Sequence, residues 1–239
     1  MPVPKNFWVE ARGPARNLNE AVEQFGNTSL LFATMIALTA NADMGQLEPE
    51  LVFDVTPGTS EHDFLQSFVP DPPIDAVPGR PIDVELVSAV VAALAGHEDQ
   101  QRLCRAAVQY VEALRSWGPG REITCIAHLY MGVEAVTKAV LRAHVRRSER
   151  SLDELVADWN LRISARANVG KEVEHEARRR LIFHGDLNCA RKAREASDAF
   201  EHGYSDFGDI HKPAREVLVR TAAYLRRAIL ETAGIAPDC

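Results

Sequence analysis

The sequence predicts a mainly α-helical protein, a helical bundle with a small α/β extension at its N-terminus. In the segment 121–147, apolar residues recur at spacings of three and four without a break, which is the period of a helix packed against other helices. Glycine and proline breakers separate this segment from further helical patterns, and strand patterns occur only near the N-terminus. The residues of the central stripe are Ile123, Ile126, Tyr130, Val133, Thr137, Val140 and His144.

The N-terminal part, residues 1–80, is predicted to be an α/β extension of unknown role. Residues 16–42 have a helical pattern that we expect to be interrupted near Gly26 and Asn27. Strands are predicted over 50–56, ending at Pro57-Gly58, and over 63–69. Residues 70–81 contain five prolines. Because proline cannot donate a backbone hydrogen bond, this segment is predicted to be a linker to a helical domain over 82–239.

The helical domain is predicted to contain several helices separated by clear stop signals. Ser151 and Glu154 have the spacing of a capping box, in which each side chain bonds to the backbone of the other residue. Gly185 is a helix stop, since glycine enters the left-handed conformation without a Cβ penalty. The expected helices are 82–95, 99–117, 121–147, 151–165, 171–184, 188–202 and 210–233.

Charge is distributed unevenly along the chain, which has a net charge of −7. Residues 1–100 carry 4 basic and 15 acidic side chains, net −11, whereas residues 101–239 carry 23 basic and 19 acidic ones, net +4. A contact with a polyanion such as RNA is therefore expected in the C-terminal part.

The apolar runs of the chain are too short to span a membrane, and its first residues have no apolar signal core. The four cysteines lie far apart and form no Cys-x-x-Cys pair. We therefore expect a cytoplasmic protein with reduced thiols, no membrane contact, no metal and no cofactor.

The segment 174–186 carries the candidate site. Three arginines, Arg178, Arg179 and Arg180, lie about one turn before His184. A guanidinium binds phosphate through a planar fork, and an imidazole transfers protons near neutral pH, so together they suit phosphodiester chemistry. On a helical wheel, Arg180 and His184 lie within about 20° of the face of Val173 and Ala177. They are therefore predicted to point towards packed protein or an interface.

The motif Arg179-Arg-Leu-Ile-Phe-His184 resembles the Arg-x4-His motif of the HEPN superfamily of helical domains. The continuation through Gly185-Asp186 and the later run Phe200-Glu-His-Gly-Tyr204 are most similar to its Apea-like branch. The resemblance covers roughly residues 100–233. It implies a metal-independent ribonuclease of toxin or phage-defence type, in which arginines and histidines of two subunits face each other across a dimer cleft.

Within this resemblance, Arg179 and His184 are the implied catalytic pair. Arg178 and Arg180 are expected to bind phosphate or RNA, and Arg180 stands where the family usually has a small or polar residue. Asp186 is a candidate to orient His184, as carboxylates do at other histidine sites. Glu134, at the rim of the apolar stripe, is a candidate for a supporting role or for an arginine pair.

Three interpretations stay open at this point. The first is a dimeric ribonuclease. The second is a catalytically silent helical module that binds RNA, a nucleotide or a partner protein. The third is purely structural, with Glu174 pairing with Arg178 and Glu176 with Arg180 at the favourable i,i+4 spacing.

Overall fold

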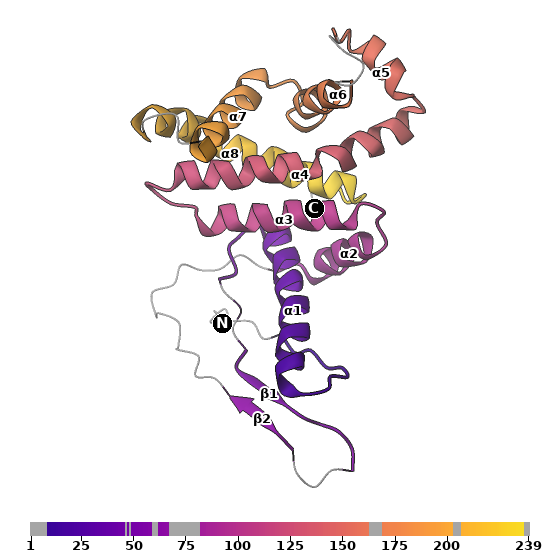
Figure 1. Cartoon of the computed structure of the whole chain (residues 1–239), viewed down its shortest axis with the longest axis vertical. Coiled ribbons are helices and arrows are strands. Elements are labelled where there is room, and N and C mark those ends of the chain that lie inside the picture. Colours follow the sequence, from indigo (N-terminus) through magenta and orange to yellow (C-terminus); the bar gives the residue numbers. More distant parts are fainter. Residues whose placement is uncertain are drawn as a thin grey trace. The chain divides into compact units, whose positions relative to one another are not determined.

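The computed structural model describes residues 9–45, 47, 49–58, 62–66, 82–162, 169–202 and 207–236. The chain divides into two compact units, Met1–Asp83 and Val84–Cys239. The described residues are mainly helical and include a single two-stranded sheet, so the predicted fold class is confirmed (Figure 1). No described helix is long and apolar enough to cross a membrane.

The first unit contains one long helix, α1, Leu18–Ala40. It begins where the side chain of Asn17 accepts a hydrogen bond from the Glu20 amide, and it ends at Asn41, whose φ is 50°. The predicted interruption near Gly26 and Asn27 is wrong, because the helix passes through both residues. A single glycine inside a helix costs only ~1 kcal/mol, which the surrounding turns tolerate.

Two short strands complete the first unit, β1 Leu51–Phe53 and β2 Phe64–Gln66. They pair antiparallel, with Leu51 opposite Gln66 and Phe53 opposite Phe64. Both predicted strands therefore exist, and β1 is shorter than the expected 50–56, while the end of the second predicted strand, 67–69, lies outside the described residues. The predicted linker over 70–81 lies outside the described residues.

The second unit is a bundle of helices around α4, Glu122–Ser148 (Figure 1). In α4 the predicted apolar stripe is buried from Ile123 to Val140, and Ile126 and Thr137 have no exposed surface. Gly132 lets α8 approach closely, since a Cβ at that position would lie 2.5 Å from Leu225 Cδ2. The helices are α2 Val84–Ala95, α3 Gln100–Arg115, α4 Glu122–Ser148, α5 Leu152–Asp158, α6 Val169–Ala177, α7 Leu187–His202 and α8 Phe207–Thr232.

Helix α5 shows both a confirmed and a wrong prediction. The Ser151 side chain accepts from the Glu154 amide and the Glu154 carboxylate accepts from the Ser151 amide, so the predicted capping box is present. The helix was expected to reach residue 165 but ends at Asp158. Asn160 adopts a left-handed backbone conformation, φ 51°, which stops the helix there.

Candidate functional site

The motif arginines lie in a π-helical turn, η2, Arg178–Ile182, which continues α6. The amide of Phe183 donates to the Arg178 carbonyl at 2.9 Å, and the amide of Gly185 donates to the Arg179 carbonyl at 2.8 Å. The predicted α-helix over 171–184 is therefore wrong in its last turn, since the helix ends at Ile182. His184 itself enters the left-handed conformation, φ 48°, and Gly185 follows it with φ 83°.

The π turn changes which side chains of this segment are buried. Val173 and Ala177 are four residues apart and fully buried, and the next fully buried position is Ile182, five residues further on. A π turn inserts one residue relative to an α turn, so it rotates the following side chains around the helix axis. Arg180 and His184 are consequently exposed. Of the two surroundings predicted for them, packed protein of the chain is therefore wrong, and an interface stays a prediction.

Arg178 fastens the π turn to α4. Its Nε donates to the Thr137 hydroxyl at 3.1 Å, and its Nη1 lies 3.4 Å from a Glu134 carboxylate oxygen. The side chain of Arg178 is only 19 % exposed. Burial raises the pKa of the neighbouring Tyr130, although Arg178 acts in the opposite direction. Two of the predicted site residues, Arg178 and Glu134, thus form an ion pair between α4 and η2.

Arg179 and Arg180 share one carboxylate, that of the buried Glu176. Arg179 Nη1 donates to one Glu176 oxygen at 2.8 Å, and Arg180 Nε donates to the other at 2.6 Å. Arg180 also lies over the ring of Trp159, 5.8 Å from its centroid, at cation–π distance.

These contacts bear on the structural interpretation of the segment. The expected pair between Glu176 and Arg180 is present. Glu174, however, pairs with Lys138 at 3.4 Å, while Arg178 turns to Glu134. Of the two ion pairs expected at i,i+4 spacing, only the one between Glu176 and Arg180 is therefore present.

Asp186 caps helix α7 and ties it to α8. One carboxylate oxygen accepts from the Cys189 amide at 3.0 Å, and the other accepts from Arg220 Nη1 at 2.7 Å and from the Tyr224 hydroxyl at 3.4 Å. Within the described part of the chain no hydrogen bond joins Asp186 to His184. The structure therefore places Asp186 near the motif as an anchor of the loop that carries His184.

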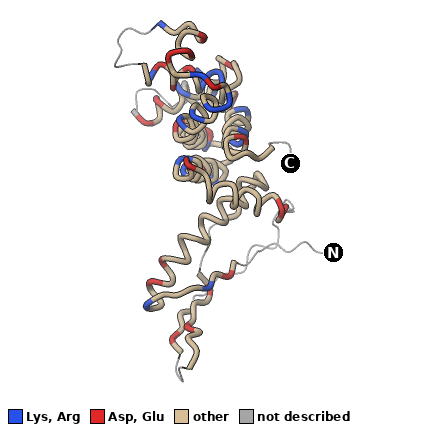
Figure 2. Tube along the Cα trace, turned by 90° about the vertical axis from the view of Figure 1, so that its right-hand side faces the viewer, with Lys and Arg blue, Asp and Glu red and all other residues tan. Residues whose placement is uncertain are grey.

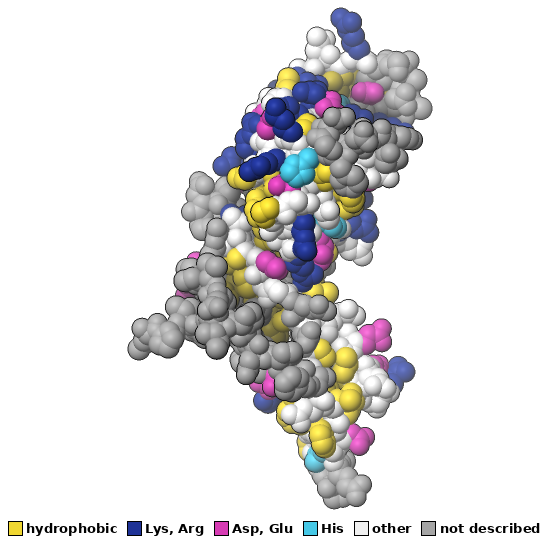
Figure 3. Space-filling model, turned by 90° about the vertical axis from the view of Figure 1, so that its left-hand side faces the viewer, with side chains coloured by type: hydrophobic (Ala, Val, Ile, Leu, Met, Phe, Trp, Pro, Cys, Tyr) yellow, Lys and Arg dark blue, Asp and Glu magenta, His cyan; other side chains and the backbone are white. Residues whose placement is uncertain are grey.

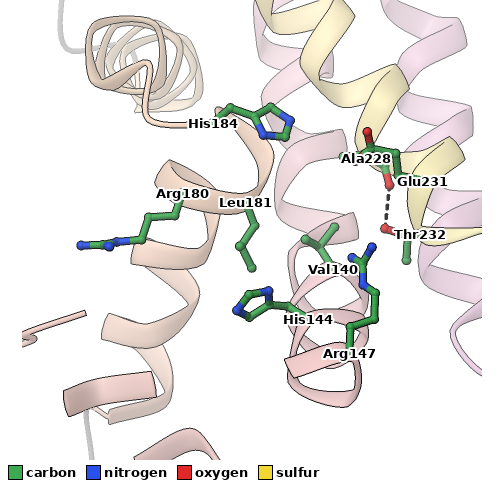
Figure 4. A pocket seen from close by; sticks show the side chains of 9 residues that line it. All are labelled: Val140, His144, Arg147, Arg180, Leu181, His184, Ala228, Glu231 and Thr232. Atoms are coloured by element: carbon green, nitrogen blue, oxygen red, sulfur yellow. Dashed lines mark hydrogen bonds between the residues drawn. The ribbon is translucent and has the colours of Figure 1, made fainter. Parts of the chain in front are cut away.

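His184 is exposed at the edge of a pocket of about 240 Å³ that lies between α4, η2 and α8 (Figure 4). Its ring lies 6.0 Å from that of Tyr224, centroid to centroid, and is tilted by 48°. Neither of its ring nitrogens has a hydrogen-bond partner among the described residues. Arg180 also lines the pocket, but Arg179 does not. The structure thus brings Arg180 and His184 to one pocket and leaves Arg179 outside it.

Two further pocket residues, His144 and Arg147, were missed in the sequence. His144 was read as the end of the apolar stripe, but it is only half-buried. Burial lowers the pKa of His144, and Arg147 and Arg150 lower it further. The signal available was a titratable residue at the end of an apolar stripe with an arginine one turn later.

Basic side chains are concentrated on the second unit, as the sequence counts indicate (Figure 2). Figure 3 shows lysine and arginine side chains over the helices of the bundle, with histidine and acidic side chains between them. Among the described residues, no group of three His, Cys, Asp or Glu side chains is placed to hold a metal ion.

Comparisons of this chain with protein-family models, with curated proteins and with solved structures found no match.

Proposed function

We propose that this chain is an endoribonuclease of HEPN type that needs no metal ion, acts as a homodimer in the cytoplasm, and uses Arg179 and His184. The observation that carries the proposal is the presentation of His184. Its imidazole is exposed at a pocket edge, its nitrogens bond to no described residue, and it follows a turn of three arginines. π-Helical turns occur frequently at functional sites, and here the motif itself forms one.

The reaction that these groups suit is the intramolecular transfer of a phosphoryl group from a 5′-oxygen to the neighbouring 2′-oxygen of the RNA strand. A neutral imidazole takes the proton of a ribose 2′-OH, and the 2′-oxygen forms a bond to the adjacent phosphorus. The bond from phosphorus to the 5′-oxygen breaks, and a protonated imidazole donates its proton to that leaving oxygen. The products are a 2′,3′-cyclic phosphate and a 5′-hydroxyl, so protons and electron pairs balance without an additional reactant.

Arg179 is proposed to stabilise the negative charge that builds up on the phosphoryl oxygens. Glu176 accepts one hydrogen bond from Nη1 of Arg179, and a guanidinium has five N–H donors in a fixed fork. The remaining donors are available because the side chain is 37 % exposed. Glu176 therefore acts in this proposal as a positioning residue that holds the guanidinium in a fixed orientation.

The dimer is part of the proposal because the reaction uses one base and one acid. His184 would serve as one of them and the partner's His184 as the other. The exposed position of His184 at the end of η2 is compatible with such a shared cleft.

The proposal is tested with single-turnover cleavage of a mixed RNA in EDTA. His184→Ala is expected to abolish cleavage, since proton transfer is lost. Arg179→Ala is expected to slow cleavage about 10²–10³-fold, the typical effect of removing one charge-stabilising donor. Arg179→Lys is expected to restore little, because lysine lacks the bidentate fork.

Arg191→Ala is the matched control, since Arg191 is an exposed arginine of α7 paired with Glu195 at 2.7 Å. It should cleave like the wild type. Equal cleavage by the wild-type and His184→Ala proteins would refute the enzymatic role.

A second candidate function is a silent module that binds RNA without cutting it. The observation that favours it is the shared carboxylate of Glu176, which partly neutralises both Arg179 and Arg180. The same assay separates the two functions, because a silent module retains intact RNA on the protein.

A further inference from the structure

The pocket beside His184 contains groups that the proposed cleavage step does not use. His144 and Arg147 line it from α4, and Leu181 lines it from η2. In Figure 4 the two imidazoles lie at opposite ends of the pocket, with Leu181 between them, and the side chain of Arg180 points away. The guanidinium that projects towards the pocket is that of Arg147.

Among the described residues, Arg147 differs from the other arginines at or just after the end of α4 because it has no acidic partner. Arg142 pairs with Asp99, Arg146 with Glu98 and Arg150 with Asp158. Arg147 bonds through Nε to the carbonyl of Ala143, one turn earlier, at 3.3 Å. No carboxylate among the described residues lies within ion-pair distance of Arg147. Its terminal nitrogens are therefore available to an anion.

We propose that this pocket is a phosphate-binding subsite, which holds one phosphodiester group of a single-stranded RNA between Arg147 and His144. The assignment of the phosphate to RNA rests on the proposed function. The volume of about 240 Å³ is below the roughly 300–1,000 Å³ of sites for drug-sized ligands. It therefore suits a phosphate with its ribose. A guanidinium is the side chain best matched to the planar, bidentate recognition of phosphate.

The pKa of His144 depends on the positive charges around this pocket. Burial and the charges of Arg147 and Arg150 lower its pKa and so favour the neutral imidazole. The charged and titratable groups that line the pocket with it are His184, which follows η2, and Glu231 of α8, which pairs with Arg227 at 4.0 Å. Arg180 of η2 lines the rim, but its side chain points away. A bound phosphate offsets the arginine charges and so raises the pKa of His144. Binding is thus coupled to proton uptake and strengthens as the pH falls through the raised pKa that His144 has in the phosphate-bound state.

A purely structural role for Arg147 and His144 is the competing explanation. Helices α4, η2 and α8 all end beside the pocket, at Ser148, Ile182 and Thr232. The C-terminal end of a helix carries a partial negative charge, which basic side chains stabilise. In that case Arg147 contributes to stability and binds nothing. The two roles predict opposite results for the same variant.

The experiment measures binding by the full chain of a fluorescent 2′-O-methyl RNA strand, which lacks the attacking hydroxyl and cannot be cleaved. Arg147→Gln is expected to weaken binding about tenfold, which corresponds to ~1.4 kcal/mol. The affinity of the variant should also depend less on salt: the plot of log affinity against log salt should be less steep by about 0.7, the value for one phosphate contact on a single strand. The matched control is Arg146→Gln, the adjacent exposed arginine outside the pocket, which should bind within about twofold of wild type.

A second readout uses inorganic phosphate as the probe and the NMR titration of the His144 ring. Phosphate is expected to raise the pKa of His144 in the wild type and in Arg146→Gln, but not in Arg147→Gln. If inorganic phosphate alone produces this rise but the RNA strand does not bind, the pocket takes free phosphate and the RNA assignment is overturned.

Several results contradict the subsite. Unchanged binding by Arg147→Gln together with a lower melting temperature would establish the helix-end role. If Arg147→Gln and Arg146→Gln lost RNA affinity equally, the loss would come from the lower positive charge of the surface and not from a specific subsite.

Failure of the proposed function is a separate result. If the 2′-O-methyl strand binds through Arg147 while natural RNA remains uncut, the ribonuclease proposal fails and the subsite proposal stands. If Arg147→Gln binds and cuts RNA like wild type, the subsite fails and the ribonuclease stands.

Discussion

At the scale of single residues, the backbone of His184 is as informative as its side chain. His184 has a φ of 48°, in the left-handed region, where a residue with a Cβ pays about 1–2 kcal/mol. Glycine would carry no such penalty, and glycine does occupy the next position. The histidine therefore holds a conformation that costs stability while it places an imidazole at the pocket edge. Residues in such conformations concentrate at functional sites.

The cost of this conformation can be measured. His184→Gly is expected to be more stable than His184→Ala by about 1 kcal/mol, because glycine relieves the left-handed strain and alanine does not. Urea unfolding of the two variants gives the difference in their unfolding free energies, provided that these free energies depend on urea concentration with the same slope. Equal stabilities would show that the left-handed conformation carries no cost at this position.

At the scale of secondary-structure elements, close packing around α4 holds the site in place. Residues of α4 supply the Thr137 hydroxyl and the Glu134 carboxylate that bind Arg178, and they supply His144 and Arg147 to the pocket. The position of η2 therefore depends on α4, which in turn packs against α8 at Gly132. A change in the packing of α4 is expected to disturb both the bundle and the pocket.

Gly132→Val is expected to destabilise the protein by about 1–3 kcal/mol, the usual cost of adding atoms to a packed core. The added Cβ would lie 2.5 Å from Cδ2 of the fully buried Leu225, so either this side chain or the α4–α8 contact must shift. Gly170→Ala in α6 is the control, because a Cβ there meets no atom within 4 Å. The control should leave the unfolding free energy unchanged or slightly higher. A wild-type melting temperature for Gly132→Val would contradict the close approach.

Much of the helical bundle could be predicted from spacing and stop signals. The central stripe, the capping box of Ser151 and the helix ends before Gly96 and Gly118 depend on local patterns, and the structure agrees with them within a few residues. The helix break expected at Gly26 is absent, because one glycine destabilises a helix by less than the turns around it stabilise it.

The site could be predicted only in part, because a helical wheel assumes a constant α-helical turn. The π turn at Arg178–Ile182 breaks that assumption and moves Arg180 and His184 to the surface. The pairing of Arg178 with Glu134 and the presence of His144 and His184 at one pocket depend on contacts between distant segments. Such contacts leave no local pattern in one sequence.

At the scale of the whole molecule, the two compact units differ in charge. The first unit, residues 1–83, carries 4 basic and 12 acidic side chains, net −8, whereas the second, residues 84–239, carries 23 basic and 22 acidic ones, net +1. We therefore expect an RNA strand to contact the second unit rather than the first. The proposed chemistry adds a second requirement, because one His184 supplies only one of the two proton transfers. The homodimer in the proposal meets this requirement.

Light scattering is expected to give about twice the chain mass of 26.4 kDa at micromolar concentrations. Adding excess His184→Ala protein to the wild type should then inhibit cleavage, since a mixed dimer retains only one of the two His184 side chains that the reaction uses. A monomer mass at tens of micromolar would contradict a cleft shared between two subunits.

The central claim is that His184 takes part in RNA cleavage without a metal ion. The most direct measurement is the chemistry of the product ends after incubation of a defined RNA with the purified protein in EDTA, with His184→Ala and His211→Asn beside it. His211 pairs with Glu122 at 2.8 Å and does not line the pocket. We expect 2′,3′-cyclic phosphate and 5′-hydroxyl ends from the wild type and from His211→Asn, and none from His184→Ala. Intact RNA with the wild type, or the same ends from His184→Ala, would contradict the claim.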